Sequence, residues 1–124
     1  MSTFQLDNNN ANYQIRGFKP GAIQINEQIY HRSVIVMPTL LIENWPPQTF
    51  QELTLESFAP ILKHPIEILL LGTGSSLVFL PLEMQAQLNN QGIGVEIMNT
   101  SAACRTFNAL SAENRNVAAA LLLK

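Results

Sequence analysis

The sequence has little cysteine and little charge, and each shortage excludes a class of protein. Cys104 is the only cysteine, so an intrachain disulfide is excluded and a reducing compartment is expected. Charged residues make up 13% of the chain, and seven Lys and Arg stand against nine Asp and Glu, which gives a net charge of −2. Because a phosphate-backbone binder needs a basic stripe, neither nucleic acid nor anionic lipid is an expected partner.

Long apolar runs and clusters of catalytic residues are also lacking. No stretch approaches the ~20 apolar residues that cross a bilayer, and the amino terminus lacks the basic start and apolar core of a signal peptide. Two His, one Cys and dispersed carboxylates form no metal-binding or paired-acid pattern, so no metal and no cofactor is predicted. We therefore expect a cytoplasmic chain that does not span a membrane.

What is present is a large share of apolar residues, 47% of a chain of 124. That length fits a single domain, residues 1–124, with a full core. Residues 1–12 are polar and are expected to be loosely ordered. Because so few charges cover the surface, an exposed apolar patch that meets a protein partner is also expected.

The most informative stretch is residues 66–74, which read Ile-Glu-Ile-Leu-Leu-Leu-Gly-Thr-Gly. An apolar run that ends at glycines predicts a strand buried on both faces of a sheet, followed by a loop. Helical patterns lie on either side of it. Strands that alternate with helices predict an α/β fold in which any ligand crevice lies at the carboxyl ends of the strands.

The remaining pattern predicts an antiparallel meander followed by alternating helices and strands. Pro60 favours Ser57 over Thr54 as the cap of the first helix, because a proline is tolerated in the first turn. The alanines near the carboxyl terminus suit a helix, but no polar side is visible there, so we predict a strand covered on both faces. The predicted strands are residues 13–18, 22–25, 28–37, 93–98 and 117–123, with 40–42 prolonging the pairing, and the predicted helices are 55–62, 81–91 and 100–110, the last capped by Asn99 or Thr100.

The order and spacing of several segments resemble one small family. The segments are residues 68–74, 92–100, 103–110 and 115–121, and the likeness extends to 13–38 and to Trp45-Pro46. The family holds the mitochondrial complex I assembly factor three and the Mth-like domains of bacteria and archaea. The resemblance implies a three-layer fold around a mixed sheet, with the final strand antiparallel to its neighbours. It also implies a role in assembling respiratory complex I.

The candidate ligand site combines two segments expected at one edge of the sheet. Gly72, Thr73 and Gly74 could present bare backbone N–H groups to an anion, but the pattern favours the alternative, a sharp turn that needs glycine. The start of the last helix adds Thr100, Ser101 and Arg105, with Arg105 as a guanidinium clamp. The alternative is that Arg105 pairs with Glu96 or Glu113, or holds the loop in place.

Two further residues could act in other ways. Cys104 lies one turn into the last helix, where the helix dipole could lower its pKa, but a buried apolar role is the alternative. Trp45, before Pro46-Pro47, could anchor a protein partner, or it could fold over the edge of the sheet.

These observations leave three hypotheses for function. The first is a non-catalytic protein-interaction or assembly-factor-like protein whose partners include respiratory-chain subunits. The second is a protein or enzyme that binds a small anionic molecule at Gly72–Gly74 and Thr100–Arg105. The third is thiol redox chemistry at Cys104. The sequence does not define the oligomeric state.

Overall fold

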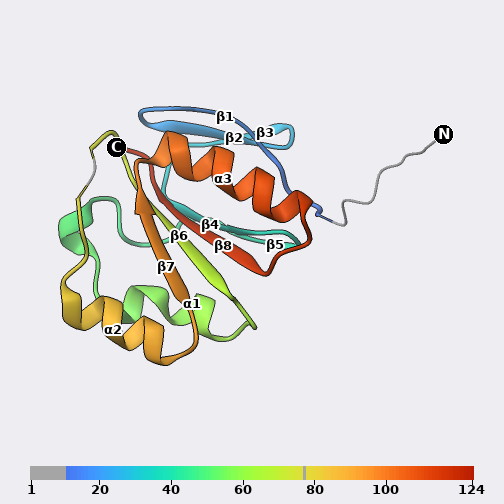
Figure 1. Cartoon of the computed structure of the whole chain (residues 1–124). Helices are drawn as coiled ribbons and strands as arrows, with labels where there is room; N and C mark the ends of the chain where they lie inside the picture. Colours follow the sequence, from blue (N-terminus) through green and yellow to red (C-terminus); the bar gives the residue numbers. More distant parts are fainter. Residues whose placement is uncertain (1–10, 77) are drawn as a thin grey trace.

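The computed structural model describes residues 11–76 and 78–124 and shows an α/β fold with two sheets (Figure 1). Of the segment expected to be loosely ordered, residues 1–10 lie outside the described residues. The smaller sheet is antiparallel and contains β1 (Ile15–Lys19), β2 (Ala22–Ile25) and β3 (Gln28–Tyr30). Its turns contain Gly21 and Asn26, both at positive φ. The predicted meander is therefore confirmed for these three strands.

The prediction of one strand over residues 28–37 is wrong. The chain leaves the small sheet at His31 and Arg32, which stay exposed, and β4 (Val34–Met37) enters the other sheet with all four residues buried. The break is held by Ser33, whose carbonyl accepts a hydrogen bond from the Trp45 N–H (2.8 Å). Because every side chain of β4 needs apolar cover, it cannot continue a sheet that is half exposed.

The larger sheet is mixed and has the order β5-β4-β8-β6-β7. The resemblance implied a final strand antiparallel to its neighbours, but this strand is antiparallel to β4 and parallel to β6. The helix that precedes this strand runs back along the sheet. The strand therefore starts at the same end of the sheet as β6 and β7. Apart from β4, the strands are β5 (Leu40–Ile42), β6 (Ile68–Thr73), β7 (Gly94–Met98) and β8 (Val117–Leu122).

Helices cover both faces of the larger sheet (Figure 1). The predicted preference for Ser57 as a helix cap is wrong: Thr54 is the cap of the short helix that starts at Leu55, and the Ser57 Oγ accepts a hydrogen bond from the Thr54 N–H (3.0 Å). On one face lies α3 (Thr100–Ala112) with the small sheet against it, and on the other lie η1 (Phe50–Glu52), η2 (Leu55–Phe58), α1 (Ala59–Leu62) and α2 (Leu82–Asn90).

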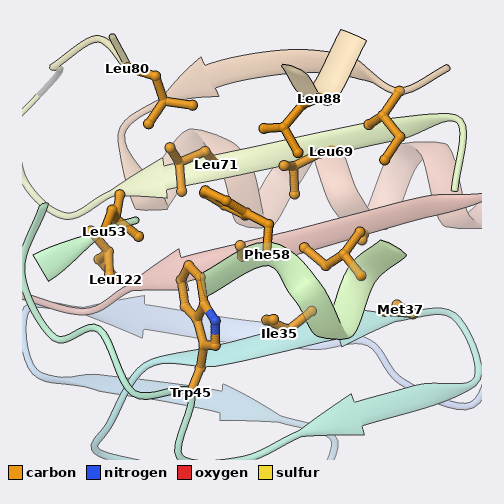
Figure 2. Packing of buried hydrophobic residues seen from close by; sticks show 14 residues of the cluster. Ile35, Met37, Trp45, Leu53, Phe58, Leu69, Leu71, Leu80, Leu88 and Leu122 are labelled. Carbon is orange, nitrogen blue, oxygen red and sulfur yellow. The ribbon is translucent and has the colours of Figure 1, made fainter. Parts of the chain in front are cut away.

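The larger sheet separates two apolar cores. Successive residues of β8 point alternately into each of them, so Ala119 faces α3 while Ala118 and Ala120 face the opposite core. All three alanines are fully buried, which confirms the choice of a strand for this segment. Figure 2 shows the opposite core, in which Trp45 reaches from its loop toward Phe58, with ring centroids 5.9 Å apart.

Candidate functional site

The glycine turn after β6 and the start of α3 lie together at the carboxyl edge of the larger sheet. The Gly74 N–H donates a hydrogen bond to Thr100 Oγ1 (2.7 Å), and the Thr100 N–H donates to the Gly74 carbonyl (2.9 Å). Thr100 Oγ1 donates in turn to the Leu122 carbonyl at the end of β8. The parallel arrangement of β6 and β7 thus brings together the two segments on which the candidate site was built.

The space between these segments is filled by the chain itself. A Cβ added to Gly72 would lie 2.9 Å from both Thr100 Oγ1 and Leu121 Cδ2. Gly74 has a left-handed φ of +83°, and a Cβ there would overlap the carbonyl of Lys124. Thr100 is fully buried. The geometry therefore favours the alternative interpretation, a turn that needs glycine, because the N–H of Gly74 already has a partner.

Thr73 points away from this junction. Its Oγ1 donates a hydrogen bond to the Ser76 carbonyl, which closes the turn locally. The hollow that Thr73 lines measures about 350 Å³ and also contains residues 48–51, but none of the α3 residues of the candidate site.

Ser101 and Arg105 line a different hollow on the other side of α3. Arg105 Nη1 donates a hydrogen bond to Ser101 Oγ (2.9 Å), one helical turn earlier. The hollow measures about 140 Å³, and Arg16 and Phe18 of β1 lie on its opposite wall. The candidate residues are consequently split: the guanidinium group expected to act with the glycine turn faces the small sheet instead.

Cys104 has the properties of a buried apolar residue. Only 6% of the residue is exposed, and loss of hydration raises the pKa of its thiol to about 12, although the nearby Arg105 charge lowers it in part. A thiol held in its neutral form is a poor nucleophile. The structure therefore supports a buried apolar role for Cys104 over redox chemistry.

Trp45 is fully buried, so the structure favours an indole that packs against the fold over one that anchors a protein partner. Its Nε1 donates a hydrogen bond to the Ser57 carbonyl (2.8 Å), which satisfies the polar end of the ring inside the core. In this loop Pro46 is exposed, whereas Trp45 and Pro47 are buried.

Among residues 11–76 and 78–124, the large apolar residues that are exposed are Ile29, Leu62, Phe79 and Leu82. Phe79 and Leu82 are the most exposed of them, and sequence reasoning missed both. Phe79 is 72% exposed and Leu82 is 84% exposed, at the start of α2. The sequence pattern of residues 81–91 counts Leu82 with Met84 and Leu88 among the apolar positions of a helix, and for Leu82 this assignment is wrong. Helical spacing contained the signal, because Leu82 precedes Met84 by two positions and Leu88 by six, which puts it on the opposite face.

The part of the chain that the structure describes holds no group of three His, Cys, Asp or Glu residues arranged to bind a metal ion. Within the same residues, none of the helices has the length and apolar character needed to span a bilayer.

An ion pair joins Arg115 to Glu67 (3.1 Å) at the amino end of β6, where both side chains are about half exposed.

Comparison with known proteins gives matches along nearly the whole chain. The family model described as "Protein of unknown function (DUF498/DUF598)" matches residues 15–122. A zebrafish (Danio rerio) protein named NADH dehydrogenase (ubiquinone) 1 alpha subcomplex assembly factor 3 is 34% identical over 110 residues, which cover 87% of this chain and 63% of that protein. The chain spans 48% and 57% of the frog and rat proteins of the same name.

Bacterial relatives match over more of their own length. The 13 kDa major membrane protein of Francisella tularensis is 29% identical over 123 residues, which are 98% of this chain and 100% of that protein. The solution structure of a Bordetella pertussis protein described as a Mth938-like domain has a TM-score of 0.80 at 27% identity. That match covers 98% of this chain and 92% of the other. The fold of this chain is therefore shared with the Mth938-like domain.

The hydroxyl of Thr100 should be needed for stability. Replacing it with the similarly shaped Thr100→Val leaves the Gly74 N–H and the Leu122 carbonyl buried without their partner, and we expect a loss of about 1–3 kcal/mol in the free energy of unfolding, measured by urea denaturation. Thr100→Ser keeps the hydroxyl and should retain most of the stability. Equal stabilities for the valine and serine variants would contradict this role of the hydroxyl.

The thiol of Cys104 should react slowly in the folded protein. A pKa of about 12 in place of the ordinary 9.0 leaves on the order of 10³-fold less thiolate at pH 8, so iodoacetamide should modify the folded chain more slowly by about that factor than the chain in urea. Because the unfolded state ionises first, stability should also fall as the pH rises from 9 toward 12. A plateau in the modification rate between pH 8 and 10 would rule out the raised pKa.

Proposed function

Since the chain belongs to the DUF498/DUF598 family of proteins of unknown function, we propose that it acts without catalysis, by binding other proteins and helping them to assemble. The observation that carries the proposal is the exposure of Phe79 and Leu82 beside the start of α2. Large apolar side chains in contact with water are a feature of surfaces that meet a protein partner. The zebrafish relative's name, an assembly factor for NADH dehydrogenase, supports the same conclusion.

Three of the residues that could have carried chemistry have structural tasks instead. Thr100 and Gly74 are hydrogen-bonded to each other, and Cys104 is held as a neutral thiol.

We extend the proposal to the partner: it is a subunit of the respiratory NADH dehydrogenase, bound in the cytoplasm before that enzyme is complete.

Loss of the chain should lower the amount of assembled NADH dehydrogenase. In the source organism, disruption of the gene should weaken the band that oxidises NADH in a native gel, and the unchanged gene should restore it. A Phe79→Ser/Leu82→Ser double variant should restore it poorly, because the apolar contact with the partner is lost. Ile29→Ser, which changes a residue 58% exposed on β3, is the matched control and should restore it fully. An unchanged band after disruption would refute the proposal.

A second candidate function is the binding of a small anion beside β1. The specific observation is that two guanidinium groups, Arg16 and Arg105, line the same hollow as Ser101. Guanidinium groups and a hydroxyl suit a phosphate or carboxylate. This proposal retains Ser101 and Arg105 from the predicted site and drops the glycine turn.

Anion binding at this hollow should appear as thermal stabilisation. We expect inorganic phosphate or citrate to raise the melting temperature of the protein, and Arg105→Ala to abolish the increase. Arg115→Ala is the matched control, since Arg115 is paired with Glu67 elsewhere. If neither anion raises the melting temperature of the unchanged protein, the candidate fails.

A further inference from the structure

The two edges of the larger sheet are unequal. At one edge, β5 has only three residues, all partly buried, and it leads into the loop with Pro46 and Pro47. At the other edge, β7 has five residues and lies at the outside of the sheet (Figure 1). A short strand followed by prolines is a protected edge, whereas a longer regular strand offers a template for another strand.

The outer side of β7 carries unpaired backbone groups. The Gly94 N–H donates to the Glu67 carbonyl (2.8 Å), so the backbone of Gly94 faces β6. The direction of the backbone N–H and C=O groups alternates along a strand. Those of Glu96 and Met98 therefore also point toward β6, while those of Val95 and Ile97 point away from it. Over residues 11–76 and 78–124, no hydrogen bond satisfies these outward groups.

The strand lacks the features that usually block an edge. Residues 94–98 contain no proline, no lysine and no bulge, and Glu96 is their sole charge. Gly94 is exposed and is not in the left-handed region, and a Cβ there would come no closer than 3.6 Å to the Glu67 carbonyl. Neither backbone conformation nor internal packing therefore requires glycine at this position, whereas glycine does let a second backbone approach closely.

Charge decides between a second copy of the chain and a different protein. An antiparallel pairing of β7 with another β7 that overlaps all five residues would set Glu96 directly opposite Glu96. Like charges opposite each other destabilise a strand pair, and opposite charges stabilise it. The half-buried side chains of Val95 and Ile97, on the other face, call for apolar neighbours.

We infer that β7 is a docking edge that accepts an extended segment of a partner protein as a sixth strand, with Lys or Arg opposite Glu96 and apolar residues opposite Val95 and Ile97. Backbone hydrogen bonds supply the attachment, and the Glu96 carboxylate selects the basic residue. This inference rests on the proposed protein-binding function and specifies its contact surface. α2, whose first residue is the exposed Leu82, packs against β7.

The test uses two synthetic peptides and the full chain labelled for NMR. The peptides, Gly-Thr-Val-Lys-Val-Thr-Gly and its counterpart with glutamate at the centre, differ only in the residue that would face Glu96. At saturation the lysine peptide should slow hydrogen exchange of the Val95 and Ile97 amides at least about tenfold, and the glutamate peptide much less. Glu96→Lys should reverse this preference. Glu83→Lys, the same charge change at an exposed position of α2, should leave it unaltered.

The outcomes separate this inference from the proposed function. If neither peptide slows hydrogen exchange of the Val95 and Ile97 amides, the inference is overturned, even if disruption of the gene impairs NADH dehydrogenase assembly. Protection of both amides in the free protein that disappears on dilution would also overturn it, because the occupant would then be a second copy. Slowed exchange with the lysine peptide, together with normal NADH dehydrogenase assembly, would uphold the docking edge and remove the proposed partner.

Discussion

The hydroxyl group of Thr100 is the contact on which the carboxyl edge of the larger sheet depends. It accepts a hydrogen bond from Gly74 and donates one to Leu122, so a single buried atom joins the end of β6, the start of α3 and the end of β8. Gly72 must lack a side chain for α3 to approach this closely. In open α/β sheets this edge is the usual position of a ligand crevice. Here the protein's own backbone and Thr100 fill the space between the glycine turn and α3, and the hollow that remains at this edge is lined by Thr73 and residues 48–51.

Much of the fold follows from local patterns in the sequence. The apolar run before Gly72 and the seven apolar residues from Val117 onward each have one satisfactory environment, a strand covered on both faces. Asn99 caps α3 by accepting a hydrogen bond from the Ala102 N–H (2.8 Å), as its residue type predicts. These features depend on residues that are close in the sequence or on fully apolar runs, and both can be recognised in a single amino-acid sequence.

The features that the sequence did not reveal depend on contacts between distant segments. Residues 28–37 contain no glycine or proline, so nothing local marks the point at Ser33 where the chain changes sheets. The direction of β8 relative to β6 is decided by the path of α3. The candidate site failed at a finer scale, because the closeness of Gly72 to Thr100 and the turning of Arg105 toward β1 are matters of a few ångströms. Side-chain types near an edge show which groups could meet there, and packing decides which of them remain accessible.

The order of the strands also affects how the chain can acquire its structure. β8 lies between β4 and β6, yet both of these strands precede it along the chain. During synthesis, the facing edges of β4 and β6 must therefore remain unpaired for a time on the order of seconds until β8 leaves the ribosome. In that interval the nascent chain exposes two apolar strand edges that are buried in the finished fold. Unpaired apolar strand edges favour aggregation, so the chain is most prone to misassociation before its last strand has been made.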